Sequence, residues 1–294
     1  MKRHNLEANT GLHPNVRIWR IPLRGSVTQL NNSAGPTFFA PNTNYEIEKM
    51  NMITRFLLAL VLCLGTAGSS VGQSKDSWME TYNGLLGKYV TDAGVKYSEW
   101  KQNASDVQAL QQVVDAIAKE NASSLGKKEQ LAFYINSYNA WILHEAVAKY
   151  PTKSVKDPLF TFFTSSRIKV AGEQMSFSHL EKDVIRSKFA DPHVHFALNC
   201  ASRSCPPLNR EVFRADKLDA QLEMLAKAFV NSKKGVAYQT DNKTAALSAI
   251  FKWYKDDFKE GGPVPFINQR RSAPLPTDAK ITFQTYDWSL NEAK

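Results

Sequence analysis

The segment from Lys127 to Lys149 carries apolar side chains around most of the circumference of one predicted helix. Its apolar positions follow a three- and four-residue spacing and also fill the faces in between: Leu131, Phe133, Tyr134, Ile135, Tyr138, Trp141 and Ile142. A surface helix shows a single apolar stripe, so this breadth predicts a helix at the centre of a domain. Pro151 would end it, because proline cannot continue the helical hydrogen-bond ladder.

The rest of the chain alternates between helical and strand-like patterns. Apolar residues at helical spacing predict further helices at about 76–90, 105–117, 178–189, 216–231 and 249–258. Alternation and turn residues predict hairpins that turn at 171–173 and 241–242, and strands at 193–199 and 281–290. Helices outnumber strands, which indicates the α+β class, with the aromatic-rich helix packed on a mixed or antiparallel sheet in a single domain.

Two Ser-x-x-Gln/Glu patterns predict where helices begin. Ser105 with Gln108 precedes the second helix, and Ser178 with Glu181 precedes a later one. Glu181 is therefore interpreted as a helix cap.

The stretch HFALNCASRSCPPL, residues 195–208, holds two of the three cysteines of the chain, Cys200 and Cys205. On the predicted strand, His195 would lie roughly 16 Å from Cys200. A nucleophile and its base must lie within about 3 Å of each other. The two side chains can therefore act together only if the chain folds back after Asn199, which the small and polar residues of the loop allow.

Three interpretations of the two cysteines remain open. They can form a disulfide that closes a tight loop, since export to an oxidising compartment favours oxidation. One of them can be a nucleophilic thiolate whose pKa is lowered by Arg203 and a nearby histidine. The pair can also be redox-active or form a mixed disulfide with a small thiol. A zinc site needs four ligands at a characteristic spacing, which C-x4-C does not supply, so we expect no metal and no cofactor.

Asn136 and Asn139 lie three residues apart on the predicted central helix, where protein surrounds them. A buried amide left without partners costs ~1–3 kcal/mol. These side chains are therefore expected either to clamp the backbone of a neighbouring loop or to orient a ligand or a catalytic histidine.

Residues 50–73 resemble a secretory signal peptide, with Arg55 before an apolar run and small residues after it. The run is shorter than the ~20 residues of a membrane-spanning helix. We therefore expect translation to start near Met50 or Met52, residues 1–49 to be a disordered or mis-assigned extension, and residues 75–294 to be one exported domain. Its expected location is the periplasm or the extracellular space.

The net charge of +9 is spread without blocks of like charge. Residues 1–73 hold seven basic and three acidic residues, which leaves 30 basic and 25 acidic residues in the remainder. The sequence contains no basic-aromatic platform and no arginine-rich arm, so no nucleic-acid partner is expected.

Four stretches in order, AFYINSYNAWILHEAV, HFALNCASRSCPPL, LSAIFKWYKDDF and YDWSLN, closely resemble the domain of unknown function 547 family. The resemblance covers most of residues 120–291. It also implies a distant likeness to papain-like thiol hydrolases and their fold, with glutathione or a related peptide as the ligand. Family members often read Ile-Glu-His-x-x-x-Arg where this chain has Leu180, Glu181 and Lys182, so that histidine is absent here while Arg186 is kept.

The resemblance implies a thiol-dependent hydrolase or transferase that acts on a peptide-like small molecule. Cys200 would attack, His195 would accept the thiol proton, and backbone N–H groups after Cys200 would stabilise the oxyanion. The expected substrate-binding residues are Asn136, Asn139, Cys205 and Arg203. The alternative is a non-catalytic periplasmic binding or scaffolding module in which the two cysteines form a structural disulfide.

Overall fold

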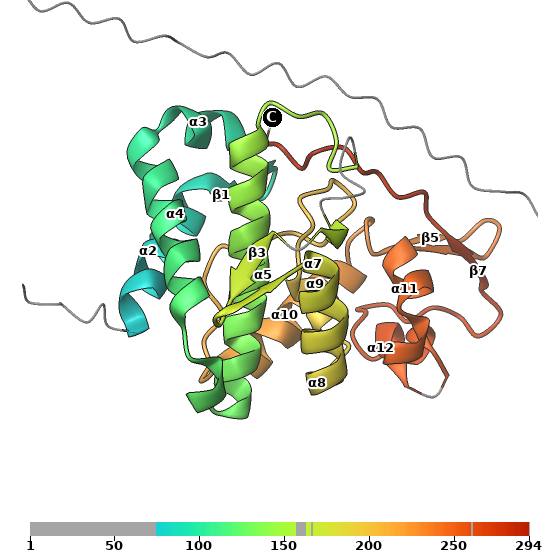
Figure 1. The fold of residues 1–294 in the computed structure, drawn as a ribbon. Coiled ribbons are helices and arrows are strands. Elements are labelled where there is room, and N and C mark those ends of the chain that lie inside the picture. Colours follow the sequence, from blue (N-terminus) through green and yellow to red (C-terminus); the bar gives the residue numbers. More distant parts are fainter. Residues whose placement is uncertain (1–74, 157–162, 166, 260, 294) are drawn as a thin grey trace, which may run out of the picture. The chain divides into compact units, whose positions relative to one another are not determined.

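The structure is a computed structural model that describes residues 75–156, 163–165, 167–259 and 261–293 (Figure 1). Its helices and strands are, in chain order, α2 (Lys75–Tyr89), β1 (Val90–Thr91), β2 (Gly94–Val95), α3 (Tyr97–Gln102), α4 (Ala104–Lys119), η1 (Ala122–Ser124), α5 (Lys127–Lys149), β3 (Ile168–Val170), β4 (Glu173–Met175), α7 (Phe177–His179), η2 (Leu180–Arg186), α8 (Ser187–Phe189), α9 (Val194–Ala197), α10 (Leu218–Val230), β5 (Val236–Gln239), β6 (Thr244–Leu247), α11 (Ala249–Trp253), η3 (Lys255–Phe258), α12 (Pro263–Asn268) and β7 (Lys280–Phe283). The predicted α+β class is confirmed.

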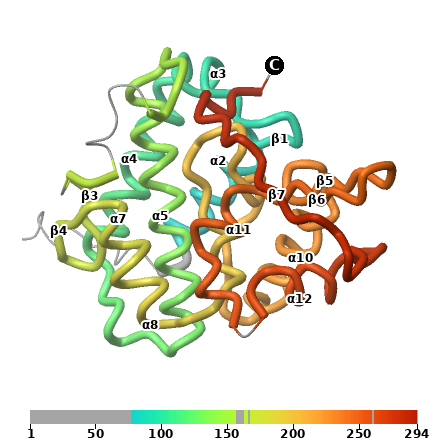
Figure 2. The backbone as a smooth tube through the Cα atoms, turned by 90° about the vertical axis from the view of Figure 1, so that its right-hand side faces the viewer, coloured from blue at the N-terminus to red at the C-terminus, as the bar shows by residue number. Residues whose placement is uncertain are grey.

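Helix α5 has the predicted bounds and is buried on nearly all sides. It packs against α3, α4 and η2, so most of its neighbours are helices. It also touches a strand, because the Trp141 indole N–H donates to the Lys169 carbonyl of β3 at 3.1 Å. In both views, α11, α12 and β5–β7 lie on the side of α5 away from α4 (Figures 1 and 2).

The helices α2 and α4 follow the apolar spacing of the sequence, but α4 begins differently from the prediction. Asn103, not Ser105, is its N-cap, and the Asn103 side chain accepts a hydrogen bond from the Asp106 N–H at 3.1 Å. Asparagine and serine cap helices about equally well, so local sequence alone could not separate the two starts.

The strands form three small sheets. β1–β2 and β3–β4 are antiparallel hairpins, and the second turns at Ala171 and Gly172 as predicted. In the third sheet β6 pairs antiparallel with β5 and parallel with β7, which makes this sheet mixed. Of the predicted last strand, 281–290, only residues 281–283 belong to a sheet, as part of β7.

The predicted strand at 193–199 is wrong. Val194–Ala197 form the short helix α9, and the chain becomes extended only at Leu198. The segment runs between two apolar clusters, with Val194 and Ala197 in the larger one and Phe196 in the smaller one. Apolar residues therefore point both ways from α9, and this produced the alternation that resembled a strand.

The C-terminal residues 284–293 form a strap across three earlier segments. The Val95 N–H of β2 donates to the Asn291 carbonyl at 2.9 Å, and the Val155 N–H donates to the Trp288 carbonyl at 3.1 Å. The Arg203 N–H in the loop between the two cysteines donates to the Ser289 carbonyl at 2.9 Å. The strap thus fixes that loop from a part of the chain far away in sequence.

The described residues fall within one compact unit, Ser69–Lys294. Among them, no helix combines the length and the apolar character needed to cross a bilayer. The expected extension 1–49 and signal peptide 50–73 lie outside the described residues, and the proposed layout of extension, signal and domain stays a prediction.

Candidate functional site

The loop from Cys200 to Cys205 brings two sulfur atoms into contact without a bond between them. Both cysteines are free, and their Sγ atoms lie 3.0 Å apart. Cys200 Sγ also lies 3.0 Å from Ser202 Oγ and 3.4 Å from the Tyr286 hydroxyl. Cys200 is half-buried, whereas Cys205 is only 5% exposed.

These contacts separate the acidities of the two thiols. The hydrogen bond with Cys205 lowers the pKa of the Cys200 thiol to about 7, with further lowering by Ser202 and Tyr286 and an opposing effect of burial. Burial, and then the hydrogen bond with Cys200, raise the pKa of Cys205 well above its usual value. Cys200 is therefore the thiolate of the pair near neutral pH, and Cys205 is its proton-bearing neighbour.

Asn199 shapes the turn that brings the sulfurs together. Its side-chain oxygen accepts from the Ala201 N–H at 2.8 Å, and its amide nitrogen donates to the Pro206 carbonyl at 2.7 Å. Ala201 has a φ of 59°, a left-handed conformation that side chains other than glycine adopt at some cost. The chain thus folds back after Asn199, as the sequence allowed.

Three backbone amides of the loop are engaged with acceptors within the protein. The Ala201 N–H donates to Asn199, and the Arg203 and Ser204 N–H groups donate to the Ser289 and Asp287 carbonyls of the strap. An oxyanion hole needs donors aimed at the position where charge develops. These three amides have acceptors in the loop and the strap, whereas the Ser202 N–H faces Cys200 and helps to lower the pKa of its thiol, so the oxyanion role of the amides after Cys200 stays a prediction.

The two asparagines of α5 clamp backbone. The Asn139 side chain donates to the Ala197 carbonyl at 2.8 Å and accepts from the Asn199 N–H at 2.9 Å. Asn136 makes the same pair of contacts with the carbonyl and N–H of Phe213, both at 2.9 Å. Asn139 therefore supports the segment that leads into Cys200, whereas Asn136 holds a different loop.

A pocket of about 200 Å³ opens onto the thiols. Its lining combines three kinds of side chain: the thiols of Cys200 and Cys205, the polar or charged groups of Ser178, Glu181, Lys182 and His195, and the apolar or aromatic groups of Tyr138, Phe163, Leu198, Ile250, Trp253, Tyr254, Tyr286 and Trp288. Of the residues expected to bind substrate, only Cys205 lies here. Asn136 borders a second cavity, and Arg203 lines a third one on the other side of Cys205.

Three rings form an aromatic wall beside Cys200, namely Trp253, Tyr286 and Trp288. The ring centroids of Tyr286 and Trp288 lie 4.6 Å apart, and Trp253 lies 4.8 Å from Tyr286. Trp253 is 47% exposed, which is unusual for a large apolar side chain beside a pocket. An exposed tryptophan packed on two partly buried aromatic rings offers apolar surface for a ligand.

A second group of lining residues is organised around Tyr254. Its hydroxyl donates to Glu181 Oε1 at 2.6 Å, and the Arg186 guanidinium lies 4.8 Å from its ring centroid. Glu181 and Arg186 stand five residues apart on η2, a helix with wide i→i+5 turns, so one turn places both next to Tyr254. Burial raises the pKa of the Glu181 carboxyl.

Glu181 is therefore not the predicted cap. Ser176 caps this helical segment by accepting from the His179 N–H at 3.0 Å. The Ser178-x-x-Glu181 pattern matches a capping box in sequence only, because the helix has already begun before Ser178.

His195 lines the pocket, but its polar partner is a carboxylate. Its Nε2 lies 2.7 Å from Asp257 Oδ2, and its ring stacks on Tyr254 with centroids 4.0 Å apart. Asp257 also accepts two hydrogen bonds from Arg186, at 2.7 and 2.9 Å. Burial lowers the pKa of His195 to about 4, against the opposing effect of Asp257. The ring is therefore neutral near pH 7.

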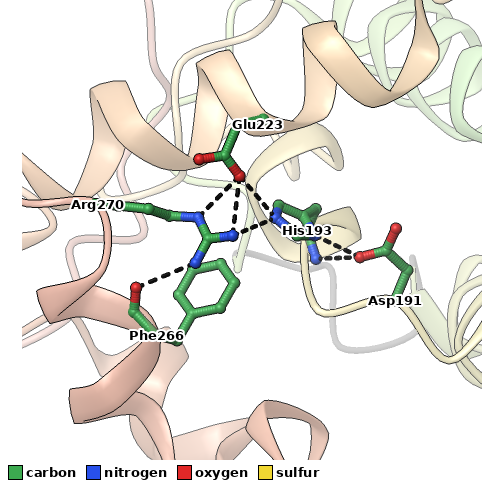
Figure 3. Close-up of polar contacts among 5 residues, drawn as sticks. All are labelled: Asp191, His193, Glu223, Phe266 and Arg270. Carbon is green, nitrogen blue, oxygen red and sulfur yellow. Dashed lines mark hydrogen bonds and ion pairs between the residues drawn. The ribbon is translucent and has the colours of Figure 1, made fainter.

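In the described part of the chain, no histidine forms a hydrogen bond with either thiol. Figure 3 shows that His193, two residues before His195, belongs to a separate polar cluster. Its Nδ1 lies 2.6 Å from Asp191 Oδ1, and its Nε2 lies 3.0 Å from Arg270 and 3.1 Å from Glu223. This cluster ties the start of α9 to α10 and α12.

Sequence reasoning did not assign roles to Ser202, Tyr286, Tyr254 and Asp257. Tyr254 and Asp257 lie in LSAIFKWYKDDF and Tyr286 lies in YDWSLN, two of the stretches that carried the family resemblance. The resemblance of these stretches to the family was the sequence signal that could have identified these three residues. Within the described residues, no group of three or more His, Cys, Asp or Glu side chains is arranged to hold a metal ion.

Comparison with known proteins gives one result. Residues 122–230 match the model of a family described as "Protein of unknown function, DUF547". That range contains α5, η2, α9 and both cysteines. No curated protein and no solved structure matches the chain significantly.

Proposed function

We propose that this chain, whose residues 122–230 belong to the DUF547 family, is an exported thiol-dependent hydrolase or transferase for a peptide-like small molecule. The observation that carries the proposal is the environment of Cys200. Its sulfur faces a pocket, has a pKa lowered to about 7, and is surrounded by hydroxyl and thiol donors. A partly exposed thiol with lowered pKa is the usual setting of a reactive cysteine.

Cys200 does not need a histidine to become nucleophilic. At pH 7 about half of a thiol with a pKa near 7 is ionised. Cys205 and Tyr286 can donate to the resulting thiolate, and the Ser202 hydroxyl, 3.0 Å from the sulfur, donates to the Tyr286 hydroxyl. In this proposal His195 is a positioning residue that holds Asp257 and Tyr254, in place of the proton-accepting role expected from the sequence.

The two sides of the pocket suit a small zwitterionic peptide. The aromatic wall offers apolar surface next to the reacting sulfur. Lys182 is an exposed cation in the lining that can pair with a peptide carboxylate, and the Glu181 carboxyl group, bonded to Tyr254, can accept a hydrogen bond from a peptide ammonium. Glutathione and related peptides carry both groups, which supports the ligand class implied by the family resemblance.

Two probes test the proposal. Iodoacetamide measures the thiolate directly, and p-nitrophenyl acetate measures acyl transfer to it. The native protein should be alkylated at Cys200 with a midpoint near pH 7 and should release p-nitrophenol. Cys200→Ser should lose both reactions, with an unchanged circular dichroism spectrum as the control for folding.

The alternative function predicts a different result. If the isolated protein shows no free thiol before reduction, and Cys200→Ser leaves p-nitrophenyl acetate turnover unchanged after reduction, the thiol enzyme is refuted. The binding or scaffolding module with a structural disulfide then becomes the better description.

A further inference from the structure

The geometry points to a further activity of the same loop: Cys200 and Cys205 act as a dithiol that exchanges with small-molecule disulfides, with Cys200 attacking and Cys205 resolving. The inference rests on the proposed reactivity of Cys200. It goes beyond the proposed function because it gives the second cysteine a chemical step of its own.

The first support is the closeness of the sulfurs. Their separation is 3.0 Å, and a disulfide bond is about 2.05 Å long, so bond formation requires a movement of only about 1 Å. The Cys200 N–H also points at Cys205 Sγ, at 3.0 Å. Asn199 holds both ends of the loop through Ala201 and Pro206, so the folded chain already presents the pair in contact.

The second support is the difference between the two thiols. Cys200 is half-buried, faces the pocket and has the lower pKa, so it meets an incoming disulfide first. Cys205 is 5% exposed and its pKa is raised by burial, so it stays protonated until a bond to Cys200 creates a target beside it. Exchange proceeds through such an order of attacking and resolving thiols.

The third support comes from the amide groups of the loop. Acyl transfer builds an oxyanion and needs donors for it. The Ala201, Arg203 and Ser204 N–H groups are engaged with Asn199 and the strap. Thiol–disulfide exchange passes negative charge from sulfur to sulfur, and the Ser202 N–H, which faces Cys200, can stabilise that charge at the attacking sulfur.

The reaction balances with a small disulfide, R–S–S–R, as the oxidant. The Cys200 thiolate attacks one sulfur of R–S–S–R, and the S–S bond of that molecule breaks. RS⁻ departs, and the other RS group stays bound to Cys200 as a mixed disulfide. Cys205 then gives up its proton to RS⁻ and attacks the Cys200 sulfur. The bond from Cys200 to the bound RS group breaks, and this second group leaves as a thiolate that takes a proton from water. The protein dithiol has lost two electrons, and the small disulfide has become two thiols.

The test uses 5,5′-dithiobis(2-nitrobenzoate) and oxidised glutathione on the reduced full chain carrying Cys63→Ala, which leaves Cys200 and Cys205 as its only cysteines and is the native background of this test. The native protein should release two equivalents of thionitrobenzoate per chain and should end without an adduct by mass spectrometry. Cys205→Ser, and Cys205→Ala as a second variant if serine impairs folding, should release one equivalent and keep a stable adduct. Oxidised glutathione should give the same pattern, with an adduct only on the variants.

The inference is overturned if the native protein accumulates a stable mixed disulfide, because Cys205 would then fail to resolve it. It is also overturned if Cys205→Ser releases two equivalents, because a different group would then act. If the native protein keeps its mixed disulfide but still turns over p-nitrophenyl acetate, only the dithiol inference is refuted. If it resolves the mixed disulfide but shows no acyl transfer, only the proposed hydrolase or acyl-transfer activity is refuted.

Discussion

Tyr286→Phe is the sharpest test of how Cys200 acquires its reactivity. The change removes one oxygen atom and keeps the ring that stacks against Trp253 and Trp288. The lost hydroxyl lies 3.4 Å from Cys200 Sγ and 3.1 Å from Ser202 Oγ. The thiolate therefore loses a donor while the aromatic wall stays in place.

The size of the effect follows from the strength of one hydrogen bond to a charged group. Such bonds contribute about 1.5–3 kcal/mol, and the low end applies here because the contact to sulfur is long and Ser202 remains as a donor. About 1.4 kcal/mol corresponds to one pKa unit, so the pKa of Cys200 should rise from about 7 to about 8. The thiolate fraction at pH 7 then falls from about one half to about one tenth.

The assay is the rate of alkylation by iodoacetamide between pH 5 and 10. A thiolate of higher pKa is intrinsically more nucleophilic, by roughly threefold per unit, which offsets much of the loss at pH 7. The midpoint of the pH profile is therefore the diagnostic quantity, with a higher plateau at alkaline pH. Tyr238→Phe, on β5 away from the pocket, is the matched control and should leave the midpoint unchanged.

An unchanged midpoint in Tyr286→Phe would show that this hydroxyl does not stabilise the thiolate. A lower plateau with an unchanged midpoint would mean that the change blocked access to sulfur. Either result would refute the reasoning given for the lowered pKa of Cys200.

Three further predictions address the other parts of the site. Burial holds the pKa of His195 at about 4, below its unfolded value of about 6.5, so the unfolded chain binds the extra proton first as pH falls. The contribution of His195 to stability should be full above pH 6.5 and should decrease by up to about 3 kcal/mol as pH falls to 4. Thermal melts of His195→Gln should show a weaker pH dependence than those of the native protein, and an equal dependence would contradict this account. Asn139→Ala and Asn136→Ala should each lower the free energy of unfolding by about 2–4 kcal/mol in urea titrations, because each leaves a buried N–H and carbonyl unpaired. Only Asn139→Ala should also shift the midpoint of Cys200 alkylation. Equal shifts in the two variants would contradict the role of Asn139 in supporting the segment that leads into Cys200. Trp253→Ala should raise KM for p-nitrophenyl acetate several-fold, leave kcat near the native value and cost under about 1 kcal/mol of stability. An unchanged KM would show that Trp253 of the aromatic wall does not contribute to substrate binding.

The central helix shows what the sequence could predict. Leu131, Ile135 and Tyr138 repeat at a helical period, and the bounds of α5 follow from that local pattern and its flanking residues. Burial of Asn136 and Asn139 follows from the same pattern, because apolar neighbours surround them on every face. Local period and burial are properties of contiguous residues, so a single sequence carries them.

The thiol site depends on contacts that no local pattern encodes. Phe196 packs into one apolar cluster and its neighbours Val194 and Ala197 into another, so a short helix mimicked the alternation of a strand. Glu181 matched a capping box, yet wide helical turns directed it to Tyr254. These outcomes depend on tertiary packing, which overrides the local preference.

The strap has a consequence for the chain while it is being made. The Tyr286 hydroxyl that donates to Cys200 comes from a residue 86 positions later in the chain. Cys205, whose hydrogen bond lowers the pKa of Cys200 most, lies in the same loop, whereas Tyr286 completes the set of donors from the far end of the domain. The full lowering of the Cys200 pKa therefore requires a chain that has been synthesised as far as the strap.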